Sequence, residues 1–448
     1  MKPSFSVPRF AALWIALVLP AGLWAQSAPP ISKVFGATHI PLGGSTTLSF
    51  TIDNTDPINT VFSINFADTL PAGLVVSTPN GLTGSCGGGD IAATEGGNEV
   101  DLGDVTRASL SPSTSCTFSV NVTGIAAGVQ NNTTSAVSCD CSPTDQTASA
   151  SVTVDPPSPP TISKSFGAAS IGVNGSTSLS FTITNPNVYS SLSGVGFSDT
   201  LPTGLVVSTP NGLSGSCGGG GITAMAASNS VSLSGAALAA SGSCTFSVNV
   251  TGSTTGTKNN ITGAVTSTEG GTGLTASASL TVLNPPTISK LFGAASITVN
   301  GSTSLSFTII NPNAGTSLTG VGFTDTLPAG LVVSSPNGLS GSCGGGGITA
   351  TPASGSVSLL GATLAASASC TFSVNVTGTT TGTKNNITGA VSSTQTGAGS
   401  TASASLAVQP PAIPVLSPWA LAGLALLLAG MGWVLARKAQ VQRSRPNV

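Results

Sequence analysis

The chain has 448 residues, of which 40% are hydrophobic and only 6% are charged, and its formal net charge is −2. Disordered segments combine low hydrophobicity with high net charge, so this composition predicts folded domains. All fourteen acidic residues and six of the basic ones lie between the two termini, which gives this central part a net charge of −8. Nucleic-acid binding requires clustered Lys and Arg, so the composition excludes nucleic acid as a partner.

The first 25 residues have the layout of a secretory signal peptide. Lys2 and Arg9 precede an apolar run at 10–19, and a small-residue region ends at Ala25. A basic start, a short apolar core and a small residue at the cleavage point define such signals. We expect residues 1–25 to be removed after Ala25. The alternative, an uncleaved anchor, is disfavoured because the apolar run is short.

The exported part consists of three long repeats. Thr-Ile-Ser-Lys occurs at 161–164 and again at 287–290, and a first copy begins at Ile31-Ser32-Lys33. Each copy also contains Asp-Thr-Leu-Pro-x-Gly-Leu. A period this long indicates tandem domains and excludes a solenoid of 20–50-residue units. The predicted domains cover residues 26–157, 158–284 and 285–409.

Each repeat has the residue pattern of β-strands. Leu179, Phe181 and Ile183 alternate with Ser and Thr, and the same alternation runs through 244–250. A period of two places the apolar residues on one face of a strand. Turn-forming Asn, Pro and Gly separate these runs. The pattern predicts an all-β chain of three tandem antiparallel β-sandwiches, with seven or eight short strands each, joined by Pro-rich spacers into a rod.

Six of the eight cysteines recur in phase with the repeats. One pair per repeat in an exported chain indicates one disulfide within each domain. The predicted pairs are Cys86–Cys116, Cys217–Cys244 and Cys343–Cys370. Cys139 and Cys141 occur only in the first copy, and they either pair in a tight ring or cross-link outward. Zinc is disfavoured because two cysteines per repeat lack further ligands.

Catalytic residue types are scarce. His39 is the only histidine, so a nucleophile–His arrangement cannot occur in every repeat; we expect His39 to be a surface residue. The glycines at 218–221 lack the Lys and helix of a phosphate loop. Five acidic residues of the first copy contain oxygens suited to calcium, but they match no calcium-loop spacing, and a solvated acidic loop is favoured. They are Asp90, Glu95, Glu99, Asp101 and Asp104. The sequence therefore predicts no enzyme, cofactor or metal site.

A Lys, an Asn and an Asp recur at fixed spacing in each repeat. The Asn follows the Lys by 21 residues and the Asp by 35; the sets are Lys33, Asn54 and Asp68, then Lys164, Asn185 and Asp199, then Lys290, Asn311 and Asp325. These are the ingredients of an autocatalytic isopeptide bond, which occurs in some bacterial surface sandwiches. The alternative is a Lys on an edge strand, an Asp that bonds turn amides and an Asn in an Asn-Pro turn. We favour this alternative.

The C-terminal segment has the composition of a membrane span. An uncharged apolar stretch covers 419–436, and Arg437 and Lys438 follow it directly. About 18 to 20 apolar residues suffice to cross a bilayer as a helix, and the basic residues after it predict a cytoplasmic end. We expect a Pro-rich linker at 410–418, a transmembrane helix at 419–436 and a basic cytoplasmic tail at 437–448.

The residues before this span resemble a known sorting signal. Ile413-Pro414-Val415-Leu416-Ser417-Pro418-Trp419, followed by the span and basic tail, is similar to the IPTL-CTERM signal of Gram-negative bacteria, a relative of exosortase-type signals. Val415, Pro418 and Ala420 stand where that pattern usually has Thr, Glu and Gly. The repeats, through Asp-Thr-Leu-Pro-x-Gly-Leu, resemble an uncharacterised repeat domain of bacterial surface proteins, and this resemblance implies that the three tandem sandwiches are immunoglobulin-like. The resemblances imply export to a Gram-negative envelope and processing by an exosortase-like enzyme.

These observations predict a non-enzymatic surface protein anchored in the cell envelope, either a stalk or an adhesin-like layer. The alternative function is binding of an extracellular polysaccharide or matrix component. Carbohydrate sites usually present aromatic platforms, whereas the repeats contain no Trp and a single Tyr, so the alternative is weaker. A hydrolase is disfavoured by the lack of a repeated catalytic base.

Overall fold

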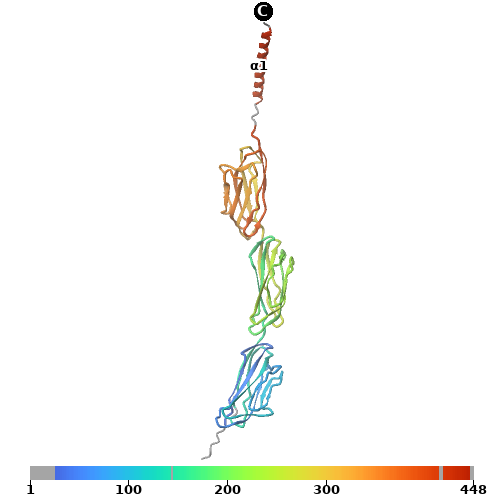
Figure 1. The fold of residues 1–448 in the computed structure, drawn as a ribbon, viewed down its shortest axis with the longest axis vertical. Coiled ribbons are helices and arrows are strands. Elements are labelled where there is room, and N and C mark those ends of the chain that lie inside the picture. The colour runs from blue at the N-terminus through green and yellow to red at the C-terminus, as the bar shows by residue number, and fades with distance from the viewer. Residues whose placement is uncertain (1–25, 143–144, 413–416, 444–448) are drawn as a thin grey trace, which may run out of the picture.

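The computed structural model describes residues 26–142, 145–412 and 417–443. Three β-sandwiches follow one another end to end, and a single helix lies beyond the third (Figure 1). The predicted all-β fold with one C-terminal apolar helix is confirmed. The predicted signal peptide, residues 1–25, lies outside the described residues.

The strands of the three domains follow the repeats of the sequence. The first domain contains β1 (Ile31–Phe35), β2 (His39–Pro41), β3 (Ser45–Asp53), β4 (Val61–Ile64), β5 (Phe66–Thr69), β6 (Leu74–Val76), β7 (Thr83–Ser85), β8 (Ile91–Ala92), β9 (Glu99–Leu102), β10 (Ala108–Leu110), β11 (Ser115–Gly124), β12 (Gly128–Thr133) and β13 (Ser149–Asp155). The second contains β14 (Thr161–Phe166), β15 (Ser170–Gly172), β16 (Ser176–Thr184), β17 (Leu192–Thr200), β18 (Leu205–Val207), β19 (Ser214–Ser216), β20 (Gly221–Thr223), β21 (Ser230–Leu238), β22 (Ser243–Gly252), β23 (Gly256–Ile261), β24 (Thr266–Ser267), β25 (Gly271–Thr272) and β26 (Ser277–Leu283). The third contains β27 (Thr287–Phe292), β28 (Ser296–Thr298), β29 (Ser302–Ile310), β30 (Leu318–Thr326), β31 (Leu331–Val333), β32 (Ser340–Ser342), β33 (Gly347–Thr349), β34 (Ser356–Leu364), β35 (Ser369–Gly378), β36 (Gly382–Ile387), β37 (Ser392–Ser393), β38 (Gly397–Ala398) and β39 (Ser403–Gln409). Short strands such as β24 and β25 make this division finer than the seven or eight strands expected per repeat.

Each domain consists of two layers, illustrated here by the second domain. One layer has the strand order β14-β16-β22-β18, with β19 also paired to β22. The other layer combines β15-β26-β23 with β20-β21-β17-β24-β25, which meet at an antiparallel bridge between Asp199 and Thr262. The first two strands of the domain belong to different layers. β14 pairs antiparallel with β16 in one layer, and β15 pairs parallel with the last strand, β26, in the other.

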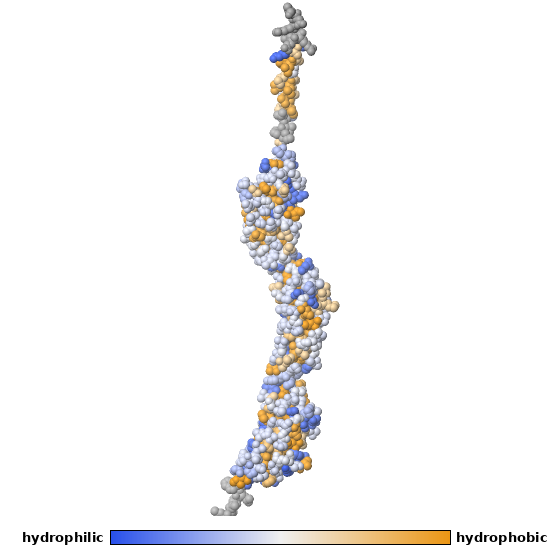
Figure 2. Space-filling model, viewed as in Figure 1, coloured by the Kyte–Doolittle hydropathy of each residue, from blue (hydrophilic) through white to orange (hydrophobic). Residues whose placement is uncertain are grey.

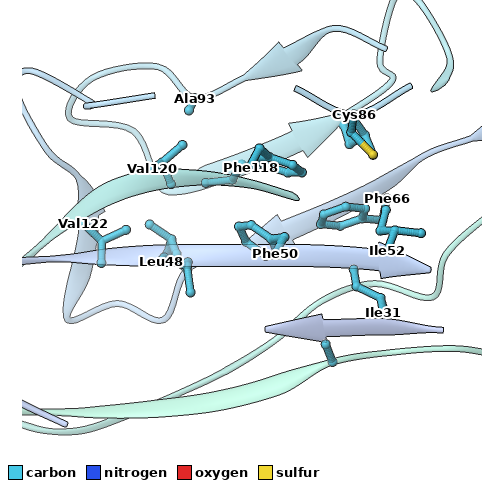
Figure 3. Close-up of a cluster of buried hydrophobic side chains, with 14 of the residues drawn as sticks. Ile31, Leu48, Phe50, Ile52, Phe66, Cys86, Ala93, Phe118, Val120 and Val122 are labelled. Atoms are coloured by element: carbon cyan, nitrogen blue, oxygen red, sulfur yellow. The ribbon is translucent and has the colours of Figure 1, made fainter. Parts of the chain in front are cut away.

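A cluster of three phenylalanines lies between the layers of each domain. In the second domain Phe181 stands opposite Phe246 in the β16–β22 register, and their ring centroids are 5.2 Å apart. Phe197 of the other layer lies 5.1 Å from Phe181. Figure 3 shows the equivalent cluster of the first domain, where Phe50, Phe66 and Phe118 pack beside Cys86. The alternating apolar positions of the sequence therefore supply the core.

The outer face of the first layer is polar but almost uncharged. In the second domain the hydroxyls of Thr182 and Thr245 lie 2.9 Å apart on neighbouring strands, and Thr51–Thr117 and Thr308–Thr371 repeat this pair at the same distance in the other domains. Cross-strand hydroxyl pairs of this kind add to sheet stability. Figure 2 accordingly shows mostly pale, neutral surface over the three domains and strongly apolar surface on the helix.

Asparagine side chains hold the linkers between domains. The amide of Asn187 donates to the carbonyl oxygen of Ser158 at 2.8 Å and accepts from the Ser158 backbone amide at 2.6 Å. Asn313 makes the same two bonds with Asn284, both at 2.8 Å. Each linker is thereby attached to the domain that follows it, because the Asn side chain bonds both the backbone N–H and the backbone carbonyl of one linker residue.

Candidate functional site

A buried group of three polar side chains lies inside the second domain. Lys164 Nζ donates to Asp199 Oδ1 at 2.9 Å, and Asn260 Nδ2 donates to Asp199 Oδ2 at 2.9 Å. The side chains of Lys164 and Asp199 have no exposed surface, and Asn260 is fully buried. Asp199 therefore contacts an amine with one carboxylate oxygen and an amide with the other.

The first and third domains contain the same group. Asp68 accepts from Lys33 at 2.7 Å and from Asn132 at 2.8 Å. Asp325 accepts from Lys290 and from Asn386, both at 2.9 Å. We call these three sets the Lys–Asp–Asn triads.

Strand alternation explains why the three side chains point inward. Asp199 follows Val195 and Phe197 on the buried face of β17. Lys164 lies on β14, opposite Phe181 of β16, and Asn260 lies on β23, where buried and exposed residues alternate. A period of two keeps all members of such a set on one face. Residues far apart in the sequence thus meet between the layers.

The surroundings of the lysine are apolar. Lys164 Nζ lies 5.7 Å from the centre of the Phe181 ring, and the equivalent distances are 5.7 Å for Lys33 and 5.8 Å for Lys290. Burial lowers the pKa of Lys164, while the hydrogen bond and the charge of Asp199 partly oppose the shift; the pKa values of Lys33 and Lys290 are lowered for the same reason. Loss of water around an ammonium group favours its neutral form.

One polar atom of each triad is left without a partner. The amide oxygens Oδ1 of Asn132, Asn260 and Asn386 are buried and accept no hydrogen bond from any residue that the structure describes. A buried acceptor without a donor costs about 1–3 kcal/mol. Such atoms are rare in folded domains, so an unpaired oxygen at the same place in all three domains calls for an explanation.

The asparagine selected from the sequence is not the one that meets the Lys–Asp pair. Asn185 donates to the carbonyl oxygens of Ser190, Leu238 and Ala239, and so organises a turn. It follows Thr184, whereas Lys164 pairs with Phe181, so the two residues are separated by about four strand positions, or ~13 Å. Asn54 and Asn311 occupy the same turn position in the other domains.

In the structure the turn asparagine and the edge strand are as the favoured alternative had them, whereas the partners of the Asp are different. Asn185 does lie in an Asn-Pro turn, and β14 is an edge strand. The Lys164 side chain is buried rather than exposed on that edge, and Asp199 accepts from Lys164 and Asn260 instead of turn amides. The Asn-Asn pairs at 131–132, 259–260 and 385–386 recur at the same place in each repeat and are the sequence signal that could have identified the triad asparagine.

Disulfides tie a loop of each domain to its core. Cys86 is bonded to Cys116, Cys217 to Cys244 and Cys343 to Cys370, with sequence separations of 30, 27 and 27. These are the pairs expected from the repeats. In the first domain Cys139 is bonded to Cys141, which corresponds to the tight-ring alternative.

The acidic cluster of the first domain has no metal-site geometry. The Asp90 carboxylate accepts from the backbone amides of Val105 and Thr106. The Glu95 carboxylate accepts from the backbone amide of Asn80. Burial, followed by the charges of neighbouring carboxylates, raises the pKa of Asp101. Among the described residues no three metal-ligating side chains converge.

The C-terminal helix α1 (Pro418–Arg443) begins within the predicted sorting segment, residues 413–419. Ser417 caps it, because its Oγ accepts from the Ala420 amide at 3.2 Å, and Pro418 occupies the first helical position, where its missing N–H is not needed. Residues 418–440 are long and apolar enough to cross a membrane, and none of this window is buried. Ile413, Pro414, Val415 and Leu416 lie outside the described residues.

The fold and these sites define a class: a string of disulfide-containing β-sandwiches followed by an apolar helix. The chain belongs to the family described as "Domain of unknown function (DUF7933)", which matches residues 29–154, 160–282 and 286–408. The IPTL-CTERM motif matches residues 411–438. The predicted sorting signal and tandem uncharacterised repeats are thus confirmed. A comparison with curated proteins gave no match.

Several solved structures are similar in part. The Streptococcus agalactiae AgI/II polypeptide BspA C-terminal domain matches 55% of this chain and 100% of its own, at 10% identity and a TM-score of 0.36. The Escherichia coli adhesin FdeC matches 85% of this chain and 98% of its own, at 15% identity and a TM-score of 0.28. The collagen adhesin CNA from S. aureus matches 57% and 94%, at 13% identity and a TM-score of 0.21. At these scores the superpositions are too loose to transfer a function.

Proposed function

We propose that this chain is a non-enzymatic surface protein of the Gram-negative cell envelope, in which three sandwiches form a stalk or adhesin-like layer. The observation that carries the proposal is the sorting motif at 411–438, with its apolar helix directly after the third sandwich. In this arrangement the helix holds the C-terminus in the membrane, and the domains extend away from it. We retain the domain boundaries 26–157, 158–284 and 285–409, which fall between the strands of successive sandwiches.

The basic residues after the helix support the proposed orientation. Arg437 lies over the Trp433 ring at 4.1 Å from its centre, where the apolar part of the helix ends. Positively charged residues remain on the cytoplasmic side, so the C-terminus is cytoplasmic before any processing. An exosortase-like enzyme is the proposed processing partner, acting near 413–419.

The anchoring proposal is tested by removing the C-terminal segment. A chain that ends after Pro411 retains all three sandwiches and should appear in the periplasm or medium, while the full chain stays in the membrane fraction. The matched control keeps the segment and replaces Ile387 by Ala, an exposed residue of the third domain. Equal membrane retention of the truncated and full chains would falsify the anchor.

Binding of a polysaccharide or matrix component remains the second candidate function. The aromatic residues of the described domains give this candidate little support. The single tyrosine, Tyr189, is stacked on His39 at the joint between the first two domains, with ring centroids 5.1 Å apart. His39 is also 3.0 Å from Asp155. Both aromatic rings are thus engaged between domains. Glycan-array binding by the exported domains would favour this candidate over a purely structural role.

A further inference from the structure

The Lys–Asp–Asn triads place an amine, a carboxylate and a carboxamide together in a site closed to solvent. From this arrangement we propose that each domain forms an isopeptide bond between the Lys Nζ and the Asn Cγ, with the central Asp as the proton-transfer group. The bonds join Lys33 to Asn132, Lys164 to Asn260 and Lys290 to Asn386. This inference goes beyond the proposed surface function, which requires no covalent bond within a domain.

The geometry brings both reactants to one carboxylate. Asp199 holds the nucleophile on Oδ1 and the leaving nitrogen on Oδ2, each at 2.9 Å. A group that is hydrogen-bonded to both reactants can accept a proton from one and deliver it to the other. Fixing two reactants in this way also removes the entropy cost of bringing them together.

The reaction is balanced without any further reagent. Lys164 transfers a proton from Nζ to Asp199, and the neutral amine attacks Cγ of Asn260. The new C–N bond forms and the Cγ–Nδ2 bond breaks, while Asp199 supplies its proton to the departing nitrogen, which is released as ammonia. Asp199 then accepts the second proton from Nζ, and the ammonia takes up that proton and leaves as ammonium. The net change converts a lysine ammonium and a carboxamide into a secondary amide and an ammonium ion, with no oxidation or reduction.

The environment supports the first proton transfer. Asp199 and Lys164 are a charged pair without exposed side-chain surface, beside the Phe181 ring. Transfer of one proton turns this pair into two neutral groups, which a site of low dielectric constant favours. Burial already lowers the pKa of Lys164, which increases the fraction of nucleophilic amine.

The unsatisfied amide oxygen separates this interpretation from a purely structural network. Oδ1 of Asn260 accepts no hydrogen bond in the described structure. Rotation of the carboxamide by half a turn would bring Oδ1 to Asp199, whose protonated form can donate to it. That bond would polarise Cγ for attack. In a purely structural Lys–Asp–Asn network, this rotated carboxamide would have no role.

Comparison of the three domains strengthens the argument. In the first domain Gln130 stands where the others have Lys258 and Lys384, two positions before the triad asparagine. The first domain nevertheless keeps both contacts of Asp68, at 2.7 and 2.8 Å. The neighbouring side chain has changed its chemistry, while the arrangement of reactants has not.

The experiment is the intact mass of the full-length protein, extracted from membranes and fully reduced. Each isopeptide bond lowers the mass by about 17 Da through loss of ammonia, so three bonds give a deficit of about 51 Da that reductant does not restore. Peptide mapping should find Lys164 joined to Asn260, with no proteolytic cleavage after Lys164. A fully reduced chain with the unmodified mass overturns the proposal.

Variants of one domain use the other two as internal controls. Asp199→Ala should restore about 17 Da relative to the wild type, after correction for the substituted side chain, while the other two bonds persist. Lys164→Arg keeps a cation beside Asp199 but removes the nucleophile, so it should restore the same mass even if Asp199→Ala fails to fold. Asn185→Ala should retain all three bonds. A cross-link mapped to Asn185, or one that survives in Lys164→Arg, contradicts the assignment.

Discussion

Removal of the second domain's disulfide should lower its stability by an amount that follows from the loop it closes. In the double variant Cys217→Ala/Cys244→Ala, 27 residues of chain are no longer closed into a loop in the unfolded state. In the chain-entropy model a loop of this length corresponds to about 12 cal/mol/K, or about 3.5 kcal/mol at 25 °C. This is a large part of the roughly 5–15 kcal/mol that stabilises an ordinary domain.

The assay must resolve one domain from the others. Pulse proteolysis in urea, with peptides of each domain quantified by mass spectrometry, gives a separate unfolding midpoint for each. With an m-value of about 2 kcal/mol/M, the midpoint of the second domain should fall by roughly 1.5–2 M. The third domain keeps Cys343–Cys370, and its midpoint should not change.

Reduction of the wild-type protein provides a control without any side-chain substitution. It should lower the midpoints of all three domains by similar amounts, because the three loops have similar lengths. If the double variant moves the second midpoint by less than about 0.5 M, the disulfide does not stabilise the domain as the loop argument requires. Free thiols at Cys217 and Cys244 in exported protein would remove the premise itself.

Three further perturbations test the core, the joints and the triads. Phe246→Ala should destabilise the second domain by about 3–5 kcal/mol, measured as its urea midpoint, since the ring is buried against two other phenylalanines; a loss below 1 kcal/mol contradicts the core assignment. Asn187→Ala removes both bonds to Ser158 and should broaden the distance distribution from small-angle X-ray scattering while leaving the domain midpoints nearly constant; an unchanged distribution means that the joint is held by other contacts. Asn260→Ala prevents the proposed cross-link and so leaves Lys164 as a free amine beside Asp199, and burial lowers its folded-state pKa below 10.5. The unfolded chain then holds more protons, so the free energy of unfolding should rise with pH between the lowered value and 10.5; the cross-linked wild type should lack this rise, and identical pH profiles would argue against the bond.

The fold was predictable because it depends on local patterns. The alternation around Phe181 predicts strands with one buried face, and the repeated Cys and Pro positions indicate separate domains. The end of the helix was less predictable. The apolar stretch ends at Ala436, yet α1 continues to Arg443, because residues such as Arg, Lys and Gln sustain a helix without burial.

The triad was only partly predictable, for a physical reason. The spacing of Lys164 and Asp199 was visible because both belong to repeated blocks. Asn260 is 61 residues beyond Asp199 and enters the site from another strand. In the sequence Asn185 looked equally suitable, because turn and core asparagines have the same side chain. Which of them meets the carboxylate depends on the packing of the two layers, which no local pattern specifies.

The threonine pairs on the outer sheet faces have a consequence for the medium in which the protein works. Electrostatic attraction between exposed charges weakens as the salt concentration rises. The screening length falls from about 30 Å in 0.01 M salt to about 3 Å in 1 M salt. Hydroxyl pairs such as Thr182 and Thr245, at 2.9 Å, involve no net charge and are indifferent to that change. The Lys and Asp side chains of the triads have no exposed surface, so added salt ions do not reach them. A rod built in this way should keep the same stiffness in fresh water and in brine.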